Sequence, residues 1–304
     1  MTTADRIDLL DRLMDGLMAR YRVRVPDVAR ICAALVEEGA IGSAGEIEND
    51  HIAFRSLGVP HLGIASLEKP FLNFGYTRRD SYHFAQKKLD AYWYAPPEHR
   101  YPRIFISELR VGDLSPEAQR VLRRYTDEVQ SDPTDDLNLE DPAAIDAFLH
   151  RPLWRTPTWS DYRTLAAESE YASWTVFNRY YLNHYTVSVH NLPPGFSTLA
   201  HFDAFLLRRG FKLNNSGGLI KTSPDGLLLQ SSTVAEVGPA TFANGDVHEI
   251  AGSYVEFAER RVLPQFAHLS SGELRREHRR DGFEAANADR IFESTYDAQT
   301  KRAI

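Results

Sequence analysis

The sequence contains a single cysteine, Cys32, among its 304 residues. One thiol excludes an intrachain disulfide and any zinc site built from several cysteines. Cys32 lies in the helix-spaced apolar stretch ARICAALVEEG, a setting that favours a buried structural thiol over a nucleophile.

Long apolar runs and concentrated positive charge are also missing. No stretch approaches the roughly 20 apolar residues of a membrane-spanning helix, and the N-terminus MTTADRIDLLDRLM lacks the apolar core of a signal peptide. The 35 lysines and arginines are dispersed among 42 acidic residues, which gives a net charge of −7. We therefore expect a cytoplasmic protein with no membrane or nucleic-acid partner. Small anionic substrates stay compatible with this charge, because one or two local arginines suffice to bind them.

Several common catalytic motifs are absent. The sequence has no H-E-x-x-H helix, no G-x-S-x-G elbow, no P-loop and no G-x-G-x-x-G turn. These absences exclude the commonest metalloprotease, serine-hydrolase, kinase and dinucleotide-binding classes.

The two halves of the sequence repeat one pattern, a strand followed by a helix and further strands. The first half has the strand HIAFR, a helix at 61–75, and the β-rich runs AYWYAPP and RIFISELRV. The second half has the strand NHYTVSVHNL, a helix at 196–210, a hairpin at 218–232 and the closing strand HEIAGSYVEFAERR. This alignment matches His51 with His184 and Glu108 with Glu256, which indicates an internal duplication.

The remaining segments have helical spacing. Amphipathic helices are predicted at 5–22, 26–38, 115–129 and 160–182, with Ser115 as the cap of the third. We predict one domain over 1–304, with N-terminal helices (1–45), a first module (46–112), a helical connection (113–182), a second module (183–262) and a C-terminal segment (263–304).

Polar side chains share one face of each repeated strand. Residues two apart in a strand point the same way, so His51 shares a face with Arg55, four residues on. His184 and Glu256 hold similar positions on the second-module strands. Two imidazoles and one carboxylate with open positions form the facial triad typical of non-haem Fe(II), although zinc accepts the same ligands.

Other residues compete for these roles. His190 shares the face of His184 but lies six residues along, roughly 20 Å on a straight strand, so one ion cannot bind both. The repeat favours His184. Glu108 is a structural or supporting group in this scheme, or an ion-pair partner for Arg55, and His201 lies in a helix as a half-buried polar residue.

The stretches HIAFR, FNRYYLNHYTVSVH, GSYVEFAER and RRDGFEAANADRIFEST resemble the 2-oxoadipate dioxygenase/decarboxylase (2-hydroxyglutarate synthase) family, also known as DUF1338, over nearly the whole chain. The resemblance implies an α+β fold of the vicinal oxygen chelate type, in which paired βαβββ modules form a curved metal-binding sheet. It also implies Fe(II) as cofactor, the metal ligands His51, His184 and Glu256, and Arg55 as the catalytic, substrate-binding arginine.

The implied reaction uses O₂ to convert a 2-oxoacid, 2-oxoadipate in the family, to 2-hydroxyglutarate and CO₂ in lysine catabolism. The characterised enzymes of the family are longer, so this compact chain is expected to lack a segment with substrate contacts. 2-Oxoadipate is the expected substrate, and a preference for another 2-oxoacid stays open. Arg279 or Arg280, in the C-terminal segment, is a further candidate for anion binding if the segment folds over the site. Two alternatives stay open: a metal-dependent isomerase or lyase on the same fold, and a non-catalytic small-molecule-binding relative.

Overall fold

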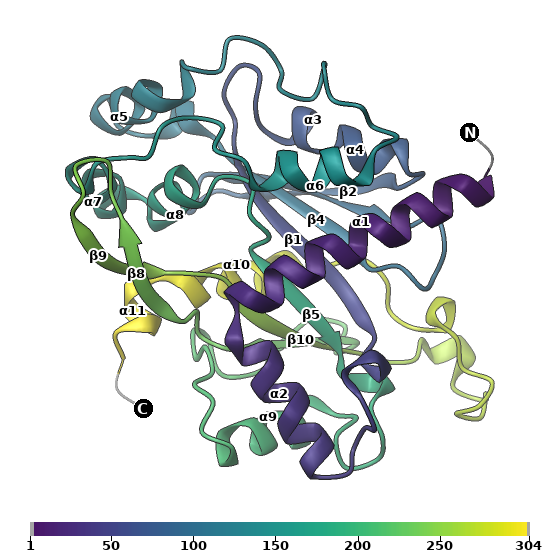
Figure 1. Cartoon of the computed structure of the whole chain (residues 1–304). Helices are drawn as coiled ribbons and strands as arrows, with labels where there is room; N and C mark the ends of the chain where they lie inside the picture. The colour runs from purple at the N-terminus through teal and green to yellow at the C-terminus, as the bar shows by residue number, and fades with distance from the viewer. Residues whose placement is uncertain (1–2, 303–304) are drawn as a thin grey trace.

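A curled eight-stranded sheet forms the centre of the computed structural model, which describes residues 3–302 (Figure 1). The strand order is β2-β3-β4-β1-β5-β10-β7-β6. The strands of this sheet are β1 (Asn49–Leu57), β2 (Thr77–Phe84), β3 (Leu89–Ala95), β4 (Arg103–Leu109), β5 (His184–Ser188), β6 (Lys221–Thr222), β7 (Leu228–Ser232) and β10 (Tyr254–Arg260). β1 and β5 pair antiparallel at the centre, and each has a parallel neighbour on its outer side, β4 and β10 respectively.

The sheet confirms the predicted duplication. The first module runs β1, α3 (Ile64–Leu67), α4 (Lys69–Asn73), β2, β3 and β4, and the second runs β5, α9 (Leu199–Arg208), β6, β7 and β10. The predicted closing strand from His248 is wrong in one respect. Its first part belongs to a separate hairpin, β8 (Val237–Thr241) and β9 (Val247–Ala251), which is inserted before β10 and has no counterpart in the first module.

The register of the parallel strands corrects one predicted pair. Phe105 lies beside Ala53 on β1, and Glu256 lies beside Thr186 on β5, so Phe105 is the counterpart of Glu256. Glu108, three residues further along β4, is therefore equivalent to Glu259 on β10. The sequence alignment of Glu108 with Glu256 is wrong because short strands of similar composition do not fix their own register.

The helices follow their sequence signals. Proline stands at the start of α2, α5 and α6, where its missing N–H costs no hydrogen bond. Ser115 caps α5 as predicted, by accepting the N–H of Ala118 at 3.2 Å. The predicted helical stretch 160–182 is two helices, because Ser169 ends the first and caps the second. The longer helices outside the modules are α1 (Thr3–Arg24), α2 (Pro26–Glu37), α5 (Pro116–Thr126), α6 (Pro142–His150), α7 (Trp159–Glu168) and α8 (Glu170–Asn178).

Short helices complete the described chain. The C-terminal ones are α10 (Ala285–Ile291) and α11 (Asp297–Thr300), and the 3₁₀ turns are η1 (Ala44–Glu46), η2 (Val111–Asp113), η3 (Val189–Asn191), η4 (Pro264–Phe266), η5 (Arg276–His278) and η6 (Phe292–Thr295). None of the helices within residues 3–302 is both long and apolar enough to span a bilayer.

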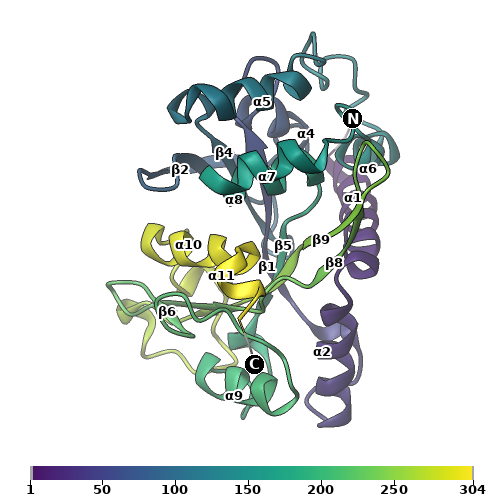
Figure 2. The same cartoon turned by 90° about the vertical axis from the view of Figure 1, so that its left-hand side faces the viewer.

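The two ends of the chain cover opposite faces of the central strands. Figure 2 shows α1 and α2 on one side of β1 and β5, and α10 and α11 on the other. On strand β1, Phe54 points toward the module helices and packs on Phe71 of α4, with ring centroids 5.4 Å apart. The alternate residues, including His51 and Arg55, are buried under the C-terminal helices instead.

Candidate metal centre

The structure brings together the three predicted ligands. His51 Nε2 lies 3.4 Å from Glu256 Oε1, and His184 Nε2 lies 3.1 Å from Glu256 Oε2. One ligand atom from each residue falls within 4.8 Å of the others, and all three side chains are buried. Cross-strand pairing explains this convergence, since β1, β5 and β10 are adjacent and present the same face.

A buried carboxylate orients His51. Asp50 Oδ1 lies 2.8 Å from His51 Nδ1, which makes Nδ1 the protonated nitrogen and turns the Nε2 lone pair toward Glu256. Burial alone raises the pKa of Asp50, but Arg260 and Arg103 outweigh it and hold that pKa well below its usual range. Asp50 is therefore a permanent anion behind the first histidine.

A neutral amide occupies the equivalent place behind His184. Asn183 Oδ1 lies 3.1 Å from His184 Nδ1, so this imidazole also presents Nε2 to the centre. Burial lowers the pKa of His184 to about 3. His184 is thus neutral at physiological pH, which is the form that binds a metal.

Glu256 is fixed by an amide chain that begins in the C-terminal helix. Gln230 Nε2 donates to Glu256 Oε1 at 2.6 Å, and Asn287 of α10 donates to Gln230 Oε1 at 3.1 Å. Burial raises the pKa of Glu256, but the two histidines outweigh it and lower the pKa below its usual value. Glu256 is therefore ionised, as a metal ligand must be.

This donor set fits a divalent metal ion. Two imidazoles and a carboxylate converge inside the protein, and among residues 3–302 no lysine or arginine forms an ion pair with Glu256. A divalent cation between these groups would balance the charge of the buried Glu256 carboxylate. The hydroxyl of Thr186 lies 3.0 Å from His51 Nε2, within hydrogen-bond distance of this ligand atom.

The competing residues lie elsewhere. β5 ends at Ser188, and the chain then turns through η3, where His190 Nδ1 accepts the backbone N–H of Arg260 at 3.2 Å. The predicted straight strand through His190 is therefore wrong, and it is His184 that reaches the centre. His201 lies exposed on α9.

Three further candidate residues have partners outside the triad. Glu108 accepts the N–H of Ile64 at the start of α3, at 2.7 Å. Arg279 donates to the carbonyl of Arg260, and Arg280 pairs with Asp225 at 3.0 Å, so neither arginine faces the triad.

Arg55 is a buried cation without an acidic partner. Its side chain is 1% exposed, and its hydrogen bonds go to Thr295 Oγ1 and the Phe292 carbonyl, each at 3.0 Å. Its guanidinium lies 4.9 Å from the ring of Trp174. Its Nε has no partner within the described chain, and no Asp or Glu there pairs with it. The predicted alternative of a pair with Glu108 is wrong.

The residues 280–295, here called the C-terminal cover, close the triad from one side. Phe283 stands edge-on to the ring of His51 at 4.7 Å, and Phe292, Ile291 and Ala288 line the same cavity. The cavity holds about 20 Å³, which is room for about one water molecule. The expectation that the C-terminal segment folds over the site is confirmed.

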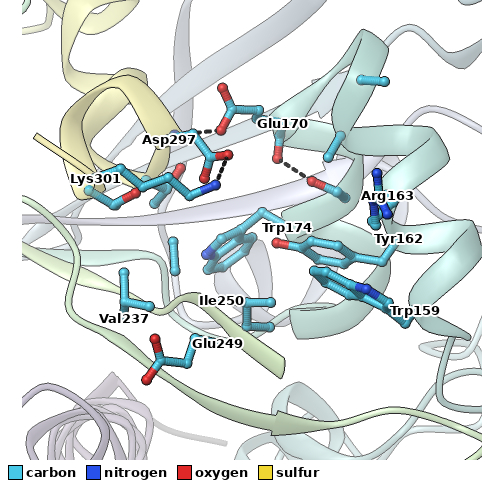
Figure 3. Close-up of a pocket in the computed structure, with 16 residues that line it drawn as sticks. Trp159, Tyr162, Arg163, Glu170, Trp174, Val237, Glu249, Ile250, Asp297 and Lys301 are labelled. Carbon is cyan, nitrogen blue, oxygen red and sulfur yellow. Dashed lines mark hydrogen bonds and ion pairs between the residues drawn. The ribbon is translucent and has the colours of Figure 1, made fainter. Parts of the chain in front are cut away.

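A larger cavity of about 620 Å³ lies between α7, α8, the β8–β9 hairpin and α11 (Figure 3). Trp174 and Thr295 line this cavity and also contact Arg55. The three predicted ligands do not line it. Two of the residues that line the larger cavity therefore lie against Arg55, and none of them is a predicted ligand.

Sequence reasoning missed the groups that support the ligands. Asp50 and Asn183 directly precede the two histidines, and this repeated acid-or-amide position was a visible signal. Gln230 and Asn287 carried no such signal, because they reach Glu256 from a strand and a helix 57 residues apart.

Paired βαβββ modules around a buried His–His–Glu group define the vicinal oxygen chelate class of proteins. A glyoxalase-superfamily structure from Ralstonia eutropha shares this fold, with a TM-score of 0.63 over 92% of this chain and 87% of the other, at 19% identity. The sequence profile of the 2-oxoadipate dioxygenase/decarboxylase family matches residues 13–270. The chain belongs to this family, as the resemblance indicated.

Two plant comparisons support this assignment. A rice protein named 2-oxoadipate dioxygenase/decarboxylase, chloroplastic/amyloplastic, is 45% identical over 83% of this chain and 70% of its own length. The crystal structure of the rice hydroxyglutarate synthase in complex with 2-oxoadipate matches with a TM-score of 0.88 and 41% identity, covering 99% of this chain and 96% of that one. The prediction of an enzyme of this type is confirmed.

Proposed function

We propose that this protein is an Fe(II)-dependent dioxygenase that converts 2-oxoadipate and O₂ to 2-hydroxyglutarate and CO₂. The reaction balances, since CO₂ leaves with the two oxygens of the C1 carboxylate and both oxygen atoms of O₂ enter 2-hydroxyglutarate, one in the new carboxylate and one in the hydroxyl group. The names of the rice proteins and the 2-oxoadipate in the rice structure support the substrate, and the His–His–Glu set supports the metal.

The observation that carries this proposal is the unpaired guanidinium of Arg55. A buried cation is costly unless an anion accompanies it, and the described residues supply none. Arg55 follows His51 by four residues on β1, about 13 Å along the strand. This spacing suits a substrate with one carboxylate at the metal and a second at the arginine.

Each group has a distinct part in the reaction. His51, His184 and Glu256 would hold the ion, and the ion would bind and activate the 2-oxoacid and O₂. Arg55 has free N–H donors, including Nε, to bind the far carboxylate and align the chain. The aromatic wall formed by Phe105, Phe283 and Phe292 excludes water from the reacting end.

The compact chain does not argue for another substrate. This chain covers 96% of the rice chain that holds 2-oxoadipate. The expected absence of a substrate-contacting segment therefore gives no reason to choose a different 2-oxoacid.

Oxygen uptake after anaerobic Fe²⁺ loading tests the proposal. We expect 2-oxoadipate to give one CO₂ and one 2-hydroxyglutarate per O₂. Shorter 2-oxoacids, and 2-oxoacids that lack the second carboxylate, should react more slowly. No uptake with any 2-oxoacid contradicts the dioxygenase. Turnover without O₂, supported by Zn²⁺ or Mn²⁺, identifies an isomerase or lyase instead.

A cytoplasmic location, expected from the composition, belongs to the same proposal and is tested by cell fractionation.

A further inference from the structure

Arg260 is a fully buried arginine at the end of β10 that the reaction itself does not use. Its side chain is 1% exposed. It forms a two-pronged ion pair with Asp50, with Nε 2.6 Å from Oδ2 and Nη2 2.9 Å from Oδ1. Such a planar fork fixes the carboxylate in one orientation.

The first connection from Arg260 leads to the metal centre. The same Asp50 Oδ1 that accepts from Arg260 also accepts from His51 Nδ1, at 2.8 Å. The position of the guanidinium therefore determines how Asp50 holds the imidazole, and so the direction of the Nε2 lone pair. His184 has no charged support of this kind, because Asn183 takes the equivalent place.

The second connection leads to the C-terminal cover. Arg260 Nη1 donates to the carbonyls of Arg280 and Gly282, at 3.0 and 2.7 Å. The next residue, Phe283, stands edge-on to His51, and its ring also lies 5.6 Å from the Arg260 guanidinium. One side chain thus holds both the support of His51 and the aromatic ring that covers it.

A second arginine, Arg103, also contacts Asp50 and the C-terminal cover, but its contact with Asp50 is weaker. Arg103 lies 3.4 Å from Asp50 Oδ2, and its Nε donates to Asp281 of the cover at 2.5 Å. Its contact with Asp50 is longer than those of Arg260 and lacks their paired geometry. We therefore expect the larger effect from Arg260.

We propose that Arg260 is a positioning residue that couples metal binding at His51 to closure of the C-terminal cover. This inference rests on the metal centre proposed above. The 20 Å³ cavity cannot admit a six-carbon acid while the cover is closed, so the cover must move during each substrate exchange. Through Arg260, that movement disturbs Asp50 and therefore His51.

Coupling of this kind is reciprocal. If closure of the cover strengthens metal binding, metal binding must stabilise the closed cover by the same factor. The two effects can be measured separately on the full chain, with Co²⁺ under anaerobic conditions as a probe that does not consume O₂.

The experiment compares wild type with Arg260→Lys and with Arg261→Lys. The control residue is the next arginine in the chain, half exposed and paired with Glu259. Calorimetry gives the Co²⁺ affinity, and amide hydrogen exchange across 280–285 reports the cover with and without Co²⁺. We expect Arg260→Lys to lose on the order of tenfold in affinity, as supporting residues of metal ligands do, and Arg261→Lys to match wild type. Co²⁺ should slow exchange in wild type and in Arg261→Lys but not in Arg260→Lys.

The outcomes separate the two proposals. Absence of Co²⁺ binding in wild type contradicts the metal centre itself. Normal affinity in Arg260→Lys with a loosened cover overturns the coupling, because Arg260 is then only a structural anchor. If Arg260→Lys does not fold, the wild-type exchange experiment decides alone: unchanged exchange across 280–285 on Co²⁺ binding overturns the coupling.

Discussion

Arg55 donates a 3.0 Å hydrogen bond to Thr295 although the two residues are 240 positions apart. The bond joins the first strand of the first module to the C-terminal cover. It holds the arginine on the same face as the ligand set but leaves its charge unbalanced within the described chain. The substrate's far carboxylate is the anion that this arrangement requires.

Replacing Arg55 by methionine should impair the dicarboxylate selectively. Truncating one partner of a buried charge pair costs about 2–5 kcal/mol, so kcat/KM for 2-oxoadipate should fall by at least about 30-fold. The same variant should retain most of its smaller activity on 2-oxohexanoate, which lacks the far carboxylate. Steady-state kinetics with both acids checks this. An equal loss on both acids argues against a carboxylate contact.

His184→Ala should abolish metal binding, whereas His190→Ala should leave it intact. Only His184 lies beside Glu256, at 3.1 Å, while His190 accepts a backbone N–H near the end of β10. Metal analysis of the purified variants after Fe²⁺ loading measures the difference. Loss of metal in the His190 variant alone would reverse the ligand assignment.

Glu108 and Glu259 should behave as a matched pair. Glu108 accepts the N–H of Ile64 and Glu259 accepts that of Leu199, so each carboxylate holds the start of its module's helix. Charged hydrogen bonds contribute about 1.5–3 kcal/mol, so Glu108→Gln and Glu259→Gln should each lower the unfolding free energy by about 1–2 kcal/mol. Metal content should not change. Denaturant unfolding and metal analysis test both parts, and metal loss in Glu108→Gln would restore it as a ligand candidate.

Asp203 should make stability depend on pH below neutrality. Burial raises its pKa to about 6 despite the hydrogen bond from Ser231 and the charge of Lys221. Between pH 3.8 and 6 the folded state then binds more protons than the unfolded state. The unfolding free energy contributed by this group therefore falls as pH rises, by about 3 kcal/mol over the window.

Urea unfolding at several pH values tests this dependence. Asp203→Asn should remove that part of the slope, while the exposed control Asp8→Asn should keep it. An identical slope in Asp203→Asn and wild type would contradict the assignment.

The sequence by itself determined the duplicated strands, the three candidate ligand residues and the family. These follow from local signals: alternation placed His51 and Arg55 on one face, and the repeat favoured His184 over His190. The match of Glu108 with Glu256 failed, because strand register depends on neighbouring strands rather than on the strand's own residues.

Only the tertiary structure decided what surrounds these groups. The break at Ser169 lies within continuous helical spacing, whereas the β8–β9 hairpin carries an Asn244-Gly245 turn signal that the sequence prediction did not use. The support of Asp50 by Arg260 crosses 210 residues, and the contact of Arg55 with Phe292 crosses 237. No local pattern encodes such pairs. A buried charged side chain needs a hydrogen-bond partner within about 3 Å, and the fold can supply that partner from any part of the sequence.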